Sequence, residues 1–86
     1  MRHSHLERYI DIINLLARYG PQKQTQIMDH ANVNSLVIEE DLRFLIKQAL
    51  IEEQTTMTKR VVFRATQRGL KVIKYFQSLK QISPII

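Results

Sequence analysis

The sequence contains no cysteine and no tryptophan, and it has only two glycines and two prolines among its 86 residues. Without cysteine the chain can form neither a disulfide nor a thiolate metal site, which fits a reducing compartment and predicts a cytoplasmic protein. No apolar run approaches the roughly 20 residues that a membrane-spanning helix needs. With 44% hydrophobic residues, residues 1–86 are expected to fold as one packed domain.

Acidic residues are missing from the C-terminal part of the chain. Residues 54–86 carry seven lysines and arginines and no Asp or Glu, whereas residues 35–53 carry five acids and two cations. A basic segment without compensating acids is typical of proteins that bind a polyanion. The alternative interpretation is a basic face that only keeps the protein soluble.

Apolar residues recur at helical spacing in four segments, and two short segments have the composition of strands. The first helix is expected to begin near His5 and to end at Gly20-Pro21. The other expected elements are a helix from about 22–24 to about 31, helices over about 35–48 and 67–81, and strands over 50–55 and 61–65. Thr66 is expected to cap the last helix, which has Gly69 in its first turn.

This order predicts a mainly α fold with a small β-hairpin, arranged α-α-α-β-β-α. Two helices joined by a tight turn and followed by a hairpin, or wing, have the connectivity of a winged helix-turn-helix domain. We expect a winged helix-turn-helix core over residues 5–66. A C-terminal dimerisation helix over 67–82 and a short tail over 83–86 are expected to follow.

Short motifs follow one another along these elements. They are Tyr9-x-x-Ile12-Ile13-x-x-Leu16-Ala17, Thr25-Gln26-Ile27-Met28, Leu42-x-x-Leu45-Ile46-x-x-Ala49-Leu50-Ile51 and Thr66-x-x-Gly69. Over roughly residues 6–80 the chain resembles the small archaeal winged helix-turn-helix DNA-binding proteins. The resemblance implies a transcriptional regulator or a nucleoid-associated chromatin protein, with a last helix that pairs with the same helix of a partner.

Two patterns depart from that family. The family has Gly-Leu-Ile where this chain has Ala49-Leu50-Ile51, and a glycine there ends the third helix in a left-handed conformation. Ala49 therefore predicts either strain or a different helix end. The third helix also carries the acidic run Glu39-Glu40-Asp41, although this helix is the one expected to meet DNA.

Double-stranded DNA is the expected partner, contacted by the helix-turn-helix and by the wing. Arg43 suits a bidentate contact with guanine and Leu36 suits a thymine methyl group. The alternative for Arg43 is an ordinary surface pair with Glu39 at i, i+4. Lys59 and Arg60 at the wing tip are expected to meet phosphates. The expected DNA-binding residues are Lys23, Gln24, Gln26, Ser35, Leu36, Arg43, Lys59, Arg60, Arg64 and Arg68.

A homodimer is expected because the apolar residues of the first and last helices cover more of each helix than one core requires. The expected dimer interface consists of Ile12, Leu15, Tyr19, Tyr75, Leu79 and Ile82. The alternative is that these side chains complete the core of a monomer.

The motifs of catalysis, cofactor binding and metal binding are absent from the sequence. His3, His5 and His30 are the only histidines, and their places in the chain do not converge on a zinc site. We expect no enzyme activity, no cofactor and no metal. The expected function is a dimeric DNA-binding transcriptional regulator, and the sequence names no effector. The alternatives are a protein that coats chromosomal DNA and, because of the acidic third helix, a protein-interaction module.

Overall fold

The structure is a computed structural model that describes residues 5–82, with side chains described up to residue 79. The elements are α1 (His5–Tyr19), α2 (Gln24–Ala31), α3 (Ser35–Lys47), β1 (Ile51–Thr55), β2 (Val61–Ala65) and α4 (Gln67–Ile82). This order confirms the predicted winged helix-turn-helix fold. The expected tail at 83–86 and the side chain of Ile82 lie outside the described residues. Within the described range, no helix combines the length and apolar character of a membrane span.

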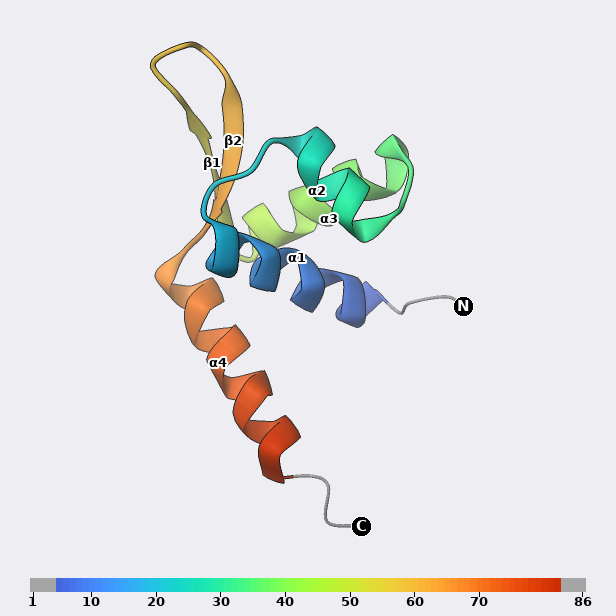
Figure 1. Cartoon of the computed structure of the whole chain (residues 1–86), viewed down its shortest axis with the longest axis vertical. Coiled ribbons are helices and arrows are strands. Elements are labelled where there is room, and N and C mark those ends of the chain that lie inside the picture. Colours follow the sequence, from blue (N-terminus) through green and yellow to red (C-terminus); the bar gives the residue numbers. More distant parts are fainter. Residues whose placement is uncertain (1–4, 83–86) are drawn as a thin grey trace.

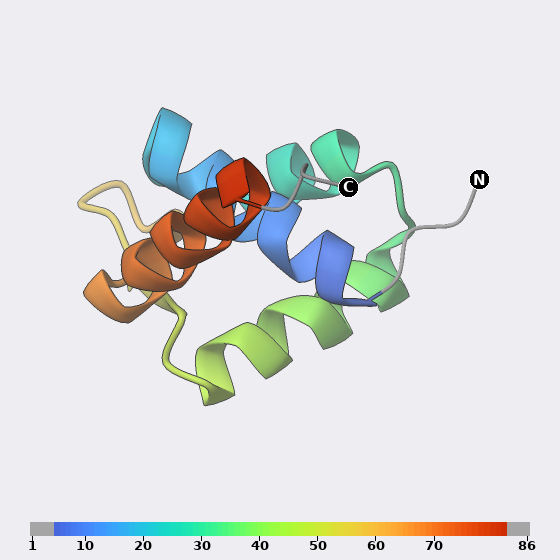
Figure 2. The ribbon, with the colours of Figure 1, turned by 90° about the horizontal axis from the view of Figure 1, so that it is seen from below.

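Helices α1, α2 and α3 surround a shared core, and the hairpin and α4 project from it in opposite directions (Figure 1). From below, α4 crosses close to α1, and α3 runs along the other side of α1 (Figure 2). The resulting shape is elongated, with extents of 49 × 29 × 21 Å. The tip of the wing and the C-terminal end of α4 therefore stand at opposite ends of the molecule.

Aliphatic side chains from every element form the core, and α1 lies at its centre. Helix α1 contacts α2, α3, β2 and α4. Ile12 and Leu15 of α1 are only 0% and 8% exposed, so they pack inside the monomer. Their assignment to a dimer interface is therefore wrong. The apolar stripe of α1 is wide because neighbours cover this helix on several sides, whereas a helix that packs on one face needs a stripe of only about 100°.

The wing is joined to the segment that precedes α2. In the hairpin, Glu53 of β1 pairs with Phe63 of β2. On the other edge of β2, the Gln22 N–H donates to the Phe63 carbonyl (3.0 Å) and the Phe63 N–H donates to the Gln22 carbonyl (2.8 Å). Sequence patterns do not predict this bridge, because a single paired residue has no strand periodicity. The bridge fixes the base of the wing beside the start of α2.

Helix α3 ends in a left-handed residue, Ala49, with φ of 60°. The Leu50 N–H donates to the Leu45 carbonyl and the Ala49 N–H to the Ile46 carbonyl, both at 2.9 Å. These bonds form the Schellman motif, in which glycine is the usual left-handed residue. Ala49 is exposed, so burial of its methyl group does not offset the strain.

Helix α4 begins against the end of α3. The Thr66 hydroxyl accepts from the Gly69 N–H (3.1 Å) and donates to the Ala49 carbonyl (2.6 Å), which confirms the predicted cap. A Cβ atom on Gly69 would lie 2.1 Å from the Leu50 carbonyl oxygen. Gly69 is therefore required for this close approach rather than for an unusual backbone angle.

Replacing Ala49 with glycine is expected to raise the free energy of unfolding by about 1 kcal/mol, because glycine adopts the left-handed conformation without a steric cost. Urea denaturation followed by circular dichroism measures the change. The control is the opposite substitution, Gly20→Ala, at φ of 81° with no atom within 4 Å of the added Cβ. It should lower stability by a similar amount. An Ala49→Gly variant no more stable than the parent would contradict the strain at this position.

Gly69→Ala is expected to lower the free energy of unfolding by about 1–3 kcal/mol, because the added methyl group collides with the Leu50 carbonyl. Alanine is otherwise the better helix former by about 1 kcal/mol. The sign of the measured change therefore decides between the two effects. A stabilised Gly69→Ala variant would show that α4 does not pack this closely on the end of α3.

Candidate nucleic-acid interface

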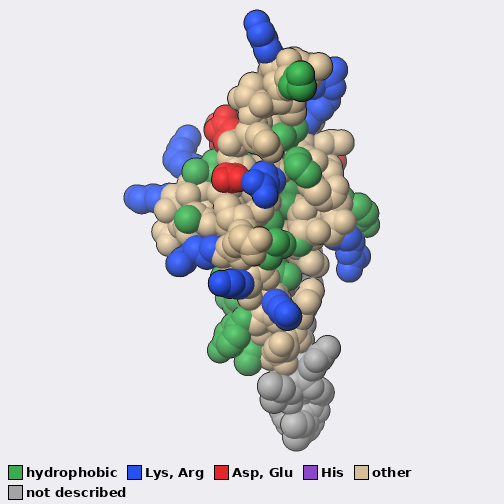
Figure 3. Space-filling model, turned by 90° about the vertical axis from the view of Figure 1, so that its left-hand side faces the viewer, with side chains coloured by type: hydrophobic (Ala, Val, Ile, Leu, Met, Phe, Trp, Pro, Cys, Tyr) green, Lys and Arg blue, Asp and Glu red, His purple; other side chains and the backbone are tan. Residues whose placement is uncertain are grey.

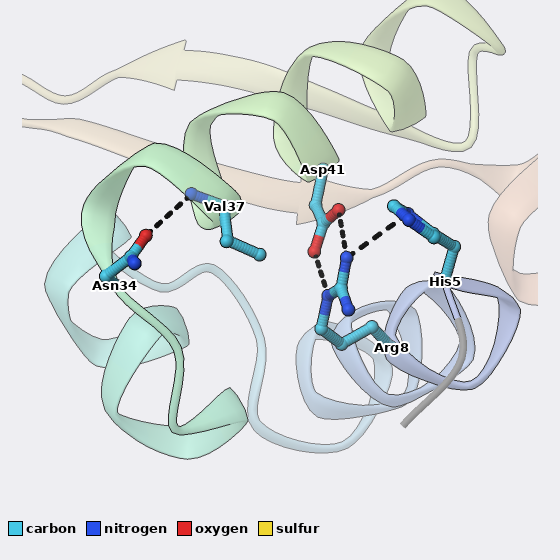
Figure 4. Close-up of polar contacts among 5 residues, drawn as sticks. All are labelled: His5, Arg8, Asn34, Val37 and Asp41. Atoms are coloured by element: carbon cyan, nitrogen blue, oxygen red, sulfur yellow. Dashed lines mark hydrogen bonds and ion pairs between the residues drawn. The ribbon is translucent and has the colours of Figure 1, made fainter. Parts of the chain in front are cut away.

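The turn between α2 and α3 is fixed at both ends by asparagines. Asn32 ends α2 in the left-handed conformation, with φ of 57°, and its N–H donates to the Met28 carbonyl. Asn34 precedes α3, and its Oδ1 accepts from the Val37 N–H at 3.0 Å (Figure 4). Of the two candidate caps, Asn34 and Ser35, the structure uses Asn34. The two caps hold α2 and α3 at a fixed angle to each other.

The side of α3 that points away from the core carries the residues expected to read bases. Leu36 at the start of the helix is 72% exposed, an unusual position for a large apolar side chain. Ile38, Leu42 and Leu45 on the other side are buried. The other exposed residues on the outward side include Ser35, Glu39, Glu40 and Arg43. This arrangement leaves the expected base-reading set free to meet a ligand.

A groove of about 540 Å³ separates α3 from the wing. It brings Gln24 of α2 and Arg43 of α3 together, two of the predicted DNA-binding residues. Two carboxylates, those of Glu39 and Glu53, line the same groove. The remaining lining residues are Leu42, Ile46, Val61 and Phe63. The groove is therefore of mixed charge, with apolar side chains between the charged ones.

The start of α2 lies beside this groove. Lys23 is half-buried, and its backbone N–H donates to the Gln26 side-chain oxygen at 2.9 Å. Gln26 therefore caps α2, and only its amide NH₂ remains to meet a ligand. Gln24 is half-buried at the first position of the helix. These three residues lie where backbone N–H groups at a helix N-terminus can donate hydrogen bonds to an anion.

The wing tip presents two cations. Lys59 and Arg60 are exposed, and neither forms an ion pair with an acid among the described side chains. Lys59 has φ of 62°, and the Thr56 N–H donates to the Arg60 carbonyl at 2.8 Å. A three-residue hairpin loop with a left-handed residue is therefore formed without glycine. Sequence composition does not reveal this turn, because its usual left-handed residue is replaced by lysine.

Basic side chains occur along the length of the face in Figure 3, from the wing to α4, with acidic side chains between them. Arg64 on the wing forms an ion pair with Glu52, the opposite residue on β1. Both side chains are about half exposed, and the DNA contact expected of Arg64 stays a prediction. Arg68 is exposed in the first turn of α4, and it is not among the residues that line the α3–wing groove.

The acidic run on α3 is less exposed than the sequence suggests. Asp41 is 1% exposed and accepts two hydrogen bonds from Arg8 of α1, from Nε at 2.6 Å and from Nη2 at 3.0 Å (Figure 4). The hydrogen bond to Asp41 holds the pKa of Arg8 above its ordinary value, although burial acts in the opposite direction. Asp41 falls on the buried stripe of α3, three residues after Ile38, and this spacing could have predicted its burial.

An aromatic contact lies next to this ion pair. The rings of Tyr9 and Phe44 stack with their centroids 4.6 Å apart. Burial raises the pKa of the Tyr9 phenol, and the nearby Asp41 carboxylate raises it further. The N-terminal half of α1 therefore contacts α3 through one charged pair and one aromatic pair.

Three residues of the expected dimer interface are on the surface. Tyr19 and Tyr75 are each 64% exposed, and Leu79 is 41% exposed. In the described part of the chain, Tyr75 and Leu79 lie one helical turn apart on α4, so they share a face. The His, Asp and Glu residues of this same part do not gather in threes at any point where a metal ion would bind.

The family model for winged helix-turn-helix domains matches residues 2–83. The chain therefore belongs to the winged helix-turn-helix family. No curated protein matches its sequence.

Solved structures share the fold at low sequence identity. A mutant of MepR from Staphylococcus aureus bound to an oligodeoxyribonucleotide has a TM-score of 0.80 at 18% identity, over 86% of this chain and 56% of that one. A mutant of ZitR from Lactococcus lactis in apo form has a TM-score of 0.79 at 17% identity, over 92% and 61%. A MarR family transcriptional regulator from Silicibacter pomeroyi has a TM-score of 0.77 at 10% identity, over 92% and 58%. The match thus spans only 56–61% of the length of these structures.

Proposed function

We propose that this protein binds double-stranded DNA through α3 and the wing and regulates transcription as a homodimer. The observation that carries the proposal is the α3–wing groove, where Gln24 and Arg43 meet below a wing tip with two unpaired cations. The fold shared with MepR, whose structure was solved with an oligodeoxyribonucleotide, supports the same partner. The relationship to small archaeal proteins of this fold stays a prediction from the sequence motifs.

In the proposed complex, the wing and the start of α2 contact phosphates. Lys59 and Arg60 neutralise the backbone, which releases counterions and makes the affinity fall as salt rises. The backbone N–H groups at the start of α2 donate to a further phosphate, close to Lys23. These contacts orient the domain on the duplex but do not read its sequence.

Base reading falls to α3 in the major groove. Arg43 donates to guanine, and Leu36, with most of its side chain exposed, packs against a thymine methyl group. Glu39 is a carboxylate of α3 on the groove wall, and it accepts from cytosine N4 or repels a misplaced phosphate. A helix with two exposed acids discriminates between sequences better than it binds any sequence tightly, which favours a regulator over a protein that coats DNA.

The homodimer is built on α4. Tyr75 and Leu79 form an exposed apolar face, and α4 extends away from the core on the side opposite the wing (Figure 1). Tyr19 at the end of α1 adds exposed aromatic surface. A twofold axis at α4 would place the two wings at the outer ends of the dimer and let each protomer occupy one half-site.

A protein-interaction module is the second candidate. The α3–wing groove has two carboxylates and exposed apolar side chains, with Ile46 37% and Val61 43% exposed. Such a surface suits a basic, apolar peptide segment as well as DNA. Fluorescence anisotropy with random duplex DNA separates the two candidates. Undetectable affinity even at low salt would reject DNA binding and leave the protein-interaction module.

Replacing both wing cations, Lys59→Ala with Arg60→Ala, is expected to weaken binding to every duplex and to reduce the slope of log affinity against log salt by about 2. Each lost phosphate contact removes roughly one unit of that slope. Anisotropy titrations at four salt concentrations measure it. The matched control is Arg64→Ala on the same hairpin, which should change the slope less because Glu52 already pairs with this arginine. An unchanged slope in the double variant would exclude the wing tip from the interface.

Leu79→Glu is expected to convert the dimer to monomers, because it places a charge in the apolar face of α4. Light scattering measures the mass directly, and circular dichroism verifies that the helices remain. Gln77→Glu, at an exposed position on the same helix outside the Tyr75–Leu79 face, is the matched control and should stay dimeric. A parent protein that is already monomeric at high concentration would reject the dimer.

A further inference from the structure

We infer that the Arg8–Asp41 pair is a positioning device that fixes the rotation and register of α3, and thereby the sequence preference of DNA binding. The inference rests on the proposed function and assigns a role to two residues that do not touch the ligand. Arg8 is on α1 and Asp41 is on α3, 33 residues apart in the chain. Figure 4 shows the guanidinium reaching across from α1 to the carboxylate.

The pair is the directional part of the α1–α3 contact. Besides Phe44, which stacks on Tyr9, the side chains that anchor α3 include Ile38, Leu42 and Leu45, all at most 3% exposed. Hydrophobic burial is non-directional, and a core that keeps only its volume and apolar pattern loses its unique arrangement before it loses stability. Two parallel N–H···O bonds between a guanidinium and a carboxylate allow only one relative orientation.

The position of Asp41 on α3 makes this orientation relevant to the ligand. Two residues advance a helix by about 200°, so Asp41 points inward almost directly behind Arg43. The pair therefore holds α3 on its buried side, in the same helical turn as Arg43, the arginine expected to read bases. Helix α1 also packs against α2, β2 and α4. Arg8 therefore fixes the position of α3 relative to the elements that form the rest of the proposed interface.

The pair also keeps one negative charge away from the proposed interface. Without Arg8, the Asp41 carboxylate would be buried without a counter-charge, next to the exposed carboxylates of Glu39 and Glu40. With Arg8 the side chain of Asp41 is 2% exposed and that of Arg8 is 13% exposed. The charges compensate each other inside the protein, and the exposed residues of α3 contribute two acids and two bases to the surface.

Stability alone does not explain why this site is ionic. Apolar residues of similar volume replace buried ion pairs with neutral or favourable effects on stability in several proteins, whereas removal of one partner is strongly destabilising. A pair that served only stability would therefore be replaceable without consequence for binding. If replacing the pair by apolar residues changes the sequence preference of binding, the pair has a positioning role; if it does not, the pair serves only stability.

The test is the double variant Arg8→Met with Asp41→Leu, which removes one charge of each sign. A preferred duplex is first selected from a random library with the parent protein. Affinities for this duplex and for a random duplex are then measured at several salt concentrations, together with the urea midpoint. We expect an unfolding midpoint no lower than that of the parent and an unchanged salt slope. We expect the preference for the selected duplex to fall about tenfold, the effect of one misplaced base contact.

Two further variants complete the design. Arg8→Lys keeps the charge but loses the two-pronged geometry, so its preference should lie between those of the parent and the double variant. Arg18→Gln with Asp29→Asn also removes one charge of each sign, at exposed sites on α1 and α2, and should keep the full preference. If the double variant fails to fold, Arg8→Lys alone decides, and undiminished preference in that variant rejects the inference.

The outcomes separate this inference from the proposed function. No binding by the parent to any duplex rejects both. Binding without any preferred duplex leaves DNA binding intact and rejects the positioning role, because there is no preference to set. A stable double variant that retains the parent's preference within about twofold shows that the pair serves the fold alone.

Discussion

The proposed interface depends on the backbone of Phe63, which lies opposite Glu53 in the hairpin and whose N–H and carbonyl both bond to Gln22 on the other edge of β2. It pairs with Glu53 of β1 on one side and with Gln22 on the other. Its side chain is 6% exposed and belongs to the same core as α1 and α3. One residue therefore connects the wing, the start of α2 and the core. Because a two-stranded hairpin is at best marginally stable alone, the direction of the wing relative to α3 follows from this connection.

Charge summed along the sequence is a poor guide to charge on this surface. The acidic segment before the wing loses Asp41 to a buried pair and Glu52 to a cross-strand pair, so fewer carboxylates oppose DNA than the composition implies. The cross-strand pair also removes Arg64 from the free cations of the basic segment. The unpaired charge that each segment presents on the surface is therefore smaller than its net charge in the sequence. The exposed cations near the proposed interface then include Lys59 and Arg60 at the tip of the wing and Arg43 on α3.

The elements and the outward side of α3 were predictable because local patterns determine them. Helical spacing and the Thr66 cap placed α4, and of the two alternatives left open at Ala49, strain or a different helix end, the structure has the left-handed, strained end. Contacts between distant residues were not predictable from such patterns. The Gln22 bridge involves a single residue, and Arg8 has no feature of the sequence that distinguishes it from a surface arginine. Ile12 was assigned to an interface because periodicity gives the width of an apolar stripe but not the number of neighbours that cover it.

The two ends of the molecule impose different requirements on the same helix, α1. Its N-terminal half contacts α3 through Arg8 and Tyr9, and α1 also packs against α4. A contact that a second copy makes on α4 can reach α3 through α1, whose core side chains are close-packed, or through the start of α4, where Thr66 bonds to the end of α3. In the proposed complex, dimerisation would set the distance between the two α3 helices, and the Arg8–Asp41 pair would set the rotation of each. A regulator needs both quantities to be fixed, whereas a protein that coats DNA without preference needs neither.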